Sequence, residues 1–342
     1  MSGSLRLELA FLLAFGSTLV LTPLAILLAR RTDFYDHPVG YKGHFQPTPY
    51  LGGCAVVGGF LAAAALTGWG ADELPPIAAG AFGLLVLGTL DDRHMMGPLP
   101  RVLIVVAAAA TLSFADLGWS IFSSDLLNLI ATIVFVLGVV NAYNLMDNMD
   151  GATGAVAVAT GLVIGVLAAS QGSVHLGAIA VALSGACAGF LRFNLASPAR
   201  IFLGDGGSMP IGFILAAATM SLPTSGHLSW ALIPVTVVLV GLPALDTTLV
   251  VVSRIRRNAG VFTGGRDHLT HRLQPKVGSA RHVAVVLALL QALLCGLGAI
   301  LLELDDAGIA AAGSLLLILL GIGVVALLES PDWAPAGSES SA

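Results

Sequence analysis

Apolar and polar positions follow one another along this chain in long blocks. Runs of mostly Leu, Ala, Val and Gly are separated by short stretches rich in Pro, charged and amide residues. Each run is close to the ~20 residues that a helix needs to cross a bilayer, and none alternates as the strands of a membrane β-barrel do. The pattern predicts an all-α, polytopic integral membrane protein of about 11 transmembrane helices. They are expected near residues 8–30, 50–68, 75–90, 101–117, 126–142, 152–170, 174–191, 208–222, 229–252, 282–302 and 307–328.

The composition supports this class of protein. The 342 residues are 56% hydrophobic and 10% charged, with a mean hydropathy of +0.92, whereas a soluble domain carries about a quarter charged residues. Residues 1–329 are expected to form a single transmembrane domain. The Pro- and Ser-rich segment 330–342 is expected to be a disordered cytoplasmic tail.

Basic residues gather in alternate loops, which predicts the orientation. Lys and Arg are enriched in the loops that stay in the cytoplasm, so the N-terminus is expected outside and the C-terminus inside. The inside loops would then be 31–49, 91–100, 143–151, 192–207 and 253–281. The formal net charge of −5 therefore averages a basic inner face and an acidic outer face. A basic inner face suits nucleotide phosphates and anionic lipid headgroups.

Carboxylates stand at the inner ends of several apolar runs, where charge is expensive and is usually functional. Asp91 and Asp92 end the third run, and Asp205 lies in the turn FLGDGGS before the eighth. Adjacent carboxylates repel unless they share a cation or a proton. Asp91-Asp92 therefore predicts a metal ligand with a base or, alternatively, a polar helix end paired with Arg93. Asp205 precedes a helix start that favours phosphate, or it only caps a tight turn.

The segment NAYNLMDNMDG at the end of the fifth run is the most specific signal. Asn141, Asn144 and Asp147 are spaced by three, which predicts a shared helical face, and Asp150 follows beside Gly151. Hard oxygen ligands of this kind suit Mg²⁺, which also binds through the phosphates of a substrate. Hydrogen bonding between helices explains one or two Asn residues, but not the whole set.

Two further inner loops carry residues suited to phosphate. Lys42 and His44 precede the turn PTP, and they are predicted to contact a phosphate, although a lysine near headgroups can also snorkel. The segment GGRDHLTHRL contains His268, His271 and Arg272. A zinc site would need more ligands, so binding of phosphate or diphosphate groups is the better interpretation.

Together these motifs resemble the polyprenyl-phosphate N-acetylhexosamine-1-phosphate transferase family, glycosyltransferase family 4, over Lys42 to Leu273. The motifs are closest to those of the UDP-GlcNAc:undecaprenyl-phosphate GlcNAc-1-phosphate transferases and more distant from phospho-N-acetylmuramoyl-pentapeptide transferase. The resemblance implies transfer of a sugar-1-phosphate, with GlcNAc-1-phosphate expected, from a UDP-sugar to undecaprenyl or decaprenyl phosphate. UMP is released in this first membrane step of cell-envelope polysaccharide synthesis.

The resemblance also implies a setting and a set of roles. Mg²⁺, or alternatively Mn²⁺, is the expected cofactor, in an enzyme of the bacterial cytoplasmic membrane with no nucleic-acid partner; a homodimer is compatible with the family. The expected catalytic residues are Asp91, Asp92, Asp147, Asp150 and His268. The expected substrate-binding residues are Lys42, His44, Asn141, His271 and Arg272. The expected metal ligands are Asn144 and Asp205.

The chain departs from the family pattern at two positions. Many members have DGxDG where this chain has Asn148 in place of the first Gly, and many have HxHH where this chain has Thr270 in place of the middle His. The second change lies in the loop expected to meet the sugar or its phosphates. The departures therefore bear on the donor sugar more than on the chemistry.

Two other classes of membrane protein also use acidic inner loops. An intramembrane aromatic prenyltransferase holds Mg²⁺-diphosphate with an NDxxDxxxD motif, and no such spacing is present here. An ion-coupled transporter places its ionisable groups near the membrane midplane at broken helices, whereas these acids lie at helix ends.

Overall fold

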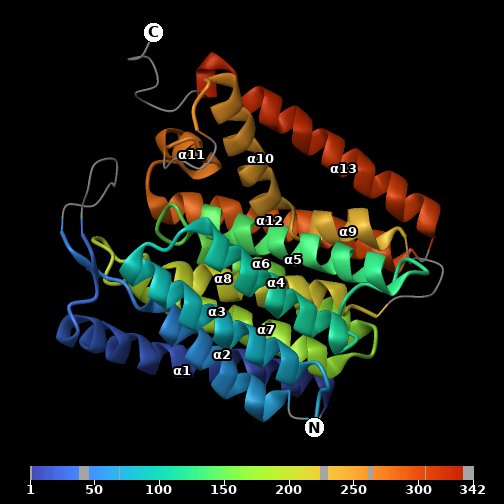
Figure 1. The fold of residues 1–342 in the computed structure, drawn as a ribbon, viewed down its shortest axis with the longest axis horizontal. Helices are drawn as coiled ribbons and strands as arrows, with labels where there is room; N and C mark the ends of the chain where they lie inside the picture. Colours follow the sequence, from blue (N-terminus) through green and yellow to red (C-terminus); the bar gives the residue numbers. More distant parts are fainter. Residues whose placement is uncertain are drawn as a thin grey trace.

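The computed structural model describes residues 2–37, 46–68, 70–223, 230–260, 265–304 and 306–333. This part of the chain is predominantly α-helical (Figure 1), as the apolar runs predicted. The predicted substrate-binding residues Lys42 and His44, and residues 334–342 of the predicted tail, lie outside the described residues.

Thirteen α-helices and one short strand pair make up the described chain. The helices are α1 (Gly3–Arg31), α2 (Gly52–Thr67), α3 (Leu74–His94), α4 (Pro98–Phe114), α5 (Asp125–Met146), α6 (Ala152–Ser170), α7 (Val174–Asn194), α8 (Asp205–Met220), α9 (Leu232–Leu239), α10 (Gly241–Arg256), α11 (Leu269–Val277), α12 (Ala280–Glu303) and α13 (Ala307–Leu328). β1 (Tyr35–Asp36) pairs antiparallel with β2 (Thr48–Pro49). A 3₁₀ turn at Pro331–Trp333 extends the folded chain past the predicted boundary at residue 329.

The membrane-spanning potential of these helices supports a multi-pass protein. Seven of the described helices are long and apolar enough to cross a membrane, or up to eight if the bent pair α9–α10 forms one span. α2 and α4 are apolar but shorter, at 16 and 17 residues. The figure of 11 spans and the orientation of the termini stay predictions.

The sequence predicted one helix over 229–252, and the structure breaks it into α9 and α10, which meet at 83° (Figure 1). Pro243 is the physical cause, because proline has no N–H to donate to the carbonyl four residues earlier, that of Leu239. Backbone groups freed at membrane depth need other partners. Here the buried Gln291 donates to the Leu239 carbonyl at 2.8 Å and accepts from the Leu242 N–H at 3.1 Å.

α8 is the central helix of the bundle. It packs against α2, α3, α5, α6 and α7, and nearly all of its residues are buried. α1 covers α2 and α7 on one side, and α12 covers α6 on the other, with α13 outermost (Figure 1). Only 17% of the apolar window of α13 is buried, so this helix is the most lipid-facing of the seven span candidates.

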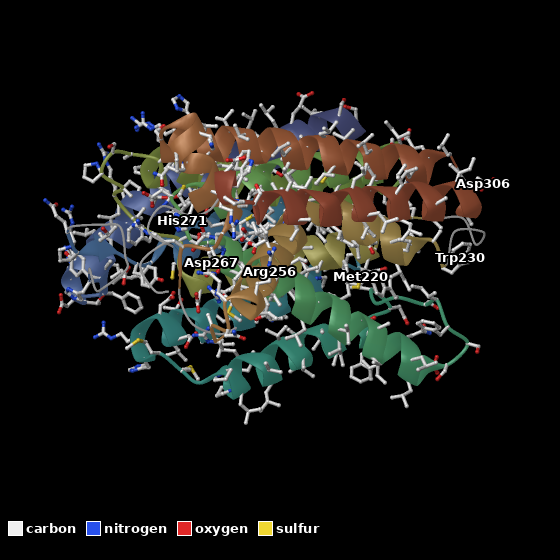
Figure 2. All side chains as sticks on the ribbon, turned by 90° about the horizontal axis from the view of Figure 1, so that it is seen from above. Met220, Trp230, Arg256, Asp267, His271 and Asp306 are labelled. Atoms are coloured by element: carbon white, nitrogen blue, oxygen red, sulfur yellow. The ribbon has the colours of Figure 1, made fainter. Side chains whose placement is uncertain are left out.

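The helices run back and forth, so their ends gather in two opposite groups. At one group the Gly151 N–H donates to the Asn194 side chain at 2.7 Å, and Arg281 donates to the Leu195 carbonyl at 2.7 Å. Figure 2 shows Trp230 and Asp306 at the right-hand end of the molecule, well away from Asp267 and His271. The end that carries the loops 91–98, 147–151 and 195–204 is the predicted inner face.

Candidate active site

The start of α8 is fixed by the segment that precedes α2. The N–H groups of Gly52 and Gly53 donate to the carbonyls of Phe202 and Leu203 at 3.0 and 2.9 Å. A Cβ on Gly53 would overlap the backbone of Gly206, so only glycine allows this close approach. The PTPYLGG segment therefore holds in place the turn that presents Asp205.

Asp92 caps α8 from a distance in sequence. Its carboxylate accepts the N–H groups of Asp205 at 2.9 Å and Gly206 at 3.1 Å. A side-chain oxygen on the unpaired amides of a helix start contributes ~1 kcal/mol, and a negative charge there also opposes the helix dipole favourably. Both oxygens of Asp92 are engaged in this contact, so the arrangement favours a positioning role over the predicted role as a base.

Asp91 is buried and paired with Arg101 at the start of α4. One of its oxygens also accepts the Met96 N–H at 2.6 Å. Arg101 reaches the Asp205 carboxylate at 3.5 Å as well, so one guanidinium lies between two acids. The sequence suggested Arg93 as the partner of the Asp91-Asp92 pair and did not identify Arg101. Arg93 instead donates to the carbonyl of Thr32 at 3.1 Å.

Asn144 and Asp205 meet, as the sequence predicted for the two metal ligands. The Asn144 amide donates to the Asp205 carboxylate at 2.8 Å and to the Ser208 hydroxyl at 3.1 Å. These bonds leave the Asn144 carbonyl oxygen for another partner. α5 and α8 are thereby joined at the ends that carry the site.

Asp147 lies at the end of α5 beside these groups. Burial, and then the negative charges of Asp205 and Asp150, raise the pKa of Asp147 to about 8, against the opposing bonds from Thr153 and the Gly204 backbone. Half-buried Asp150 follows in the same turn. Excess negative charge in a partly buried cluster is what a divalent cation relieves.

Asn141 does not join this cluster. Its side chain is exposed, and its amide donates to the Leu137 carbonyl of its own helix at 2.7 Å. Each step of three residues rotates the side chain by about 60° short of a full turn. Asn141 and Asp147 are two such steps apart, so the angle between their side chains is twice as large. They therefore do not share one helical face.

The donor set suits magnesium better than a metal held by the protein alone. Among the described residues, no group of three or more His, Cys, Asp and Glu side chains is arranged to hold a metal ion. Mg²⁺ typically keeps several waters and takes one or two carboxylates together with substrate phosphates. Asp205 and Asn144, with Asp147 beside them, fit that mode of binding.

Tyr50 is a neighbour of the cluster that sequence reasoning missed. Burial, and then the charges of Asp92, Asp205 and Asp147, raise the pKa of the Tyr50 hydroxyl above its ordinary value. The ring also packs edge-on against Phe202, with centroids 6.3 Å apart. Its position directly before the LGG segment was the feature of the sequence that could have identified Tyr50 as a neighbour of the cluster.

The second part of the site lies on α10 and α11. His268 Nδ1 is 2.8 Å from the Asp246 carboxylate, whose other oxygen accepts the Leu269 N–H at 2.6 Å. Asp246 is fully buried. A carboxylate that fixes one ring nitrogen sets the orientation and tautomer of the imidazole. Sequence reasoning missed Asp246, although a lone acid inside the apolar run 229–252 was a signal for it.

Asp267 ties this loop to α10. Arg254 binds it at 3.1 Å, and Arg257 forms a second ion pair with it. Burial opposes the charge of Asp267, but the hydrogen bonds and charges of the two arginines outweigh it and hold the pKa of Asp267 below its ordinary value. Arg257 is therefore more than the topology charge that the sequence suggested.

Arg272 anchors α11 to the end of α13. Its buried guanidinium donates to the Leu328 carbonyl, to Glu329 at 2.6 Å, to Ser253 at 3.0 Å and to the Asp267 carbonyl at 3.1 Å. With these bonds in place, the arrangement favours an anchoring role over the predicted substrate contact.

His271 lies beside His268, with ring centroids 6.3 Å apart. Burial, and then the charges of His268 and Arg266, lower the pKa of His271 to about 4. The imidazole is therefore neutral near pH 7, where it can donate or accept a hydrogen bond but carries no charge.

The site thus has two parts. The carboxylate half consists of Asp91, Asp92, Asn144, Asp147 and Asp205. The histidine half consists of Asp246, Asp267, His268 and His271. The two are joined by a hydrogen bond from the Thr270 hydroxyl to the side-chain oxygen Oδ1 of Asn148.

Comparisons with known proteins found a matching family model and similar relatives. The family model described as "Glycosyl transferase family 4" matches residues 74–223. A Bacillus subtilis protein named "Probable undecaprenyl-phosphate N-acetylglucosaminyl 1-phosphate transferase" is 28% identical over 87% of this chain and 86% of its own.

Two further relatives carry related names. A Mycobacterium leprae protein named "Decaprenyl-phosphate N-acetylglucosaminephosphotransferase" is 31% identical over 83% of this chain and 81% of its own. An Escherichia coli K12 protein named "Undecaprenyl-phosphate alpha-N-acetylglucosaminyl 1-phosphate transferase" is 25% identical over 79% of this chain and 77% of its own.

Proposed function

Because the chain belongs to glycosyl transferase family 4, we propose that it transfers GlcNAc-1-phosphate from UDP-GlcNAc to a polyprenyl phosphate and releases UMP. The acceptor follows from the names of the relatives, which act on undecaprenyl or decaprenyl phosphate. The relatives also favour a transferase over the prenyltransferase and transporter alternatives. The protein would work in the bacterial cytoplasmic membrane, with the site on the cytosolic face.

The observation that carries this proposal is the contact between Asn144 and Asp205, with Asp147 beside them. These residues come from two helices and meet at one end of the bundle, where a lipid-anchored acceptor and a cytosolic donor can both arrive. Asp205 and Asn144 would hold Mg²⁺. Bound there, the ion would act as a Lewis acid on the diphosphate oxygens of the donor.

An apolar groove gives the acceptor chain a place to lie. It has a volume of about 290 Å³ and is lined by residues of α5, α9 and α10, among them Phe135, Val139 and Pro243. Its lining includes Ala142, which is close in sequence to Asn144. A prenyl chain in the groove would bring its phosphate to the inner end of α5, beside the carboxylate half.

The transfer itself exchanges one phosphorus–oxygen bond for another. An oxygen of the acceptor phosphate forms a bond to the β-phosphorus of UDP-GlcNAc, the bond from that phosphorus to the bridging oxygen breaks, and UMP leaves with that oxygen. A phosphate monoester has a second pKa near 6, so the acceptor is largely deprotonated at pH 7 without help. The protein then mainly positions the groups and offsets their charge.

The chain's own residues divide that work. Asp92 holds the start of α8, and Asp205 with it, in place. Neutral His271 and oriented His268 would offer hydrogen bonds to the phosphates or sugar of the donor. Asp147 and Asp150 would lie nearest the nucleotide-sugar, as the family resemblance implies.

A transfer assay tests the proposal. Membranes that contain the protein would be incubated with UDP-[³H]GlcNAc, Mg²⁺ and undecaprenyl phosphate. We expect label to enter the lipid phase and an equal amount of UMP to appear, with loss of both on addition of EDTA and recovery with Mg²⁺. Mass spectrometry of the lipid product identifies the sugar. Failure with every UDP-HexNAc tried would contradict the proposed reaction.

A further inference from the structure

One hydrogen bond connects the two halves of the site through side chains that are not themselves acids or histidines. The buried Thr270 hydroxyl donates to the side-chain oxygen Oδ1 of Asn148, across 122 positions of sequence. The Asn148 amide in turn donates to the Leu145 carbonyl at 2.8 Å, at the end of α5. Asn148 is therefore held at both ends of its side chain, with little freedom to rotate.

The neighbours of this bond are the site's chemical groups. Asn148 follows Asp147 directly, and Asp150 comes two residues later. Thr270 lies between His268 and His271 at the start of α11. A shift of the Asn148–Thr270 contact would therefore move the imidazoles relative to the acids.

The position of Thr270 in its helix explains why its hydroxyl is free to reach across. Several buried threonines inside helices bond to their own helix, as Thr219 does to the Leu215 carbonyl at 2.6 Å, whereas Thr153, the second residue of α6, bonds to the Tyr143 carbonyl of α5 at 3.3 Å. Thr270 is the second residue of α11, so the residue four positions earlier, Arg266, lies before the helix. Its hydroxyl has no intrahelical carbonyl at that distance to bond.

Asn148 and Thr270 are also the two positions at which this sequence departs from the family pattern that it resembles. The resemblance implies Gly at 148 and His at 270, so relative to that pattern this chain has a larger side chain at the first position and a smaller one at the second. The sizes change in opposite directions across one contact. A matched exchange of this kind preserves the packing of two facing positions better than either change alone.

We propose that Asn148 and Thr270 are a matched positioning pair that sets the separation between the histidine half and the carboxylate half, and thereby how tightly the donor's sugar diphosphate is held. This inference rests on the proposed function for the identity of the donor. The pair touches no reacting atom in the proposed transfer, so its effect falls on donor binding more than on the chemical step.

A kinetic double-mutant cycle tests the pair. Thr270→Val and Asn148→Ala each remove one partner, and we expect each to raise the KM for UDP-GlcNAc about 3- to 10-fold with kcat within about twofold. The double variant should be no worse than the poorer single variant. Thr270→Ser keeps the hydroxyl and should stay within about twofold of the parent protein. If the KM increases of the two single variants multiply in the double variant, or if only kcat changes, the proposed pairing is contradicted.

Hydrogen–deuterium exchange gives a readout that does not need turnover. In the purified protein, Thr270→Val should speed amide exchange in α11 (Leu269–Val277), and Thr270→Ser should not. Thr219→Val is the matched control, since it removes a buried threonine hydroxyl at the other end of α8 and should leave α11 unchanged. Unchanged exchange in Thr270→Val would overturn the positioning role, whereas faster exchange in a protein that turns over no UDP-HexNAc would overturn only the proposed function.

The size exchange is tested by restoring the common residues. Thr270→His alone places an imidazole against Asn148 and should lower kcat/KM at least tenfold, because a packed contact tolerates added volume poorly. Adding Asn148→Gly to the same protein should recover most of that loss. A double variant as poor as Thr270→His would show that the two positions are not matched.

Discussion

The carboxylate half and the histidine half of the site are built in different ways. The acids and Asn144 stand at the ends of long helices that pack closely on α8, where glycines such as Gly53 and Gly88 leave no room for side chains. The histidines stand on or beside a helix of nine residues, α11, that polar bonds tie to α10 and α13.

The positions of the two halves are therefore fixed by different kinds of contact. Helix packing throughout the bundle sets the places of Asp205 and Asn144, so a single substitution elsewhere moves them little. The position of α11 depends on a few buried charged contacts, such as Arg254–Asp267 and Arg272–Glu329. Removal of one partner leaves an uncompensated buried charge, which is strongly destabilising. We infer that single substitutions change the geometry of the histidine half, which would face the donor, more readily than that of the carboxylate half.

The largest expected effect is in the carboxylate half. Asp205→Asn removes a carboxylate charge from the proposed metal site and should lower turnover by about 1,000-fold or more, while the protein still inserts and melts at a similar temperature. The transfer assay and a melting curve in detergent measure both. Near-normal turnover would remove Asp205 from the site, and Thr219→Val serves as the control for handling.

A smaller loss is expected when the orientation of His268 is disturbed. Asp246→Asn keeps the shape of the side chain but removes the charge that holds the ring, and turnover should fall by about 10- to 100-fold. Since the bond to the Leu269 N–H can be kept by the amide oxygen, α11 should remain folded. A pH–rate profile equal to that of the parent protein, with equal kcat, would contradict this role.

The histidine half should also make stability depend on pH. The pKa of His271 is lowered from 6.5 to about 4 in the folded protein, so the unfolded chain binds the proton more strongly. Stability should therefore be full above about pH 6.5 and fall as the pH drops towards 4. His271→Gln should reduce this slope between pH 7 and 5 by thermal melting. Equal slopes in the two proteins would contradict it.

The smallest effect is expected at Asn141, which the sequence predicted to be part of the site and the structure places outside the carboxylate half. Asn141→Ala should change kcat/KM by less than about twofold, because the exposed amide bonds only to its own helix. Its removal tests the boundary of the carboxylate half. A loss of tenfold or more would show that Asn141 reaches a substrate.

Much of the site was predictable because its residues follow a simple rule. Asn144 and Asp205 both stand at ends of apolar runs that the basic loops predict to be inner ends, and helices that alternate across a membrane bring such ends to one side. Their contact at 2.8 Å confirms that they meet. The same rule could not separate Asn141 from Asp147, or the role of Asp91 from that of Asp92. Residues close in sequence lie at similar depths in the membrane, and they differ instead in the direction in which their side chains point from the helix.

The sequence by itself determined most of the helices, the membrane class and the end of the bundle that holds the acids, since these follow from apolar runs and from the cost of burying charge. It did not predict α11 or the break between α9 and α10. Tertiary structure alone decided which polar side chains became supports: Asp92 as the cap of α8, Arg272 as the anchor of α11 and Asp246 as the partner of His268. The physical reason is that a buried polar group must find a partner, and the partner here comes from a helix distant in sequence.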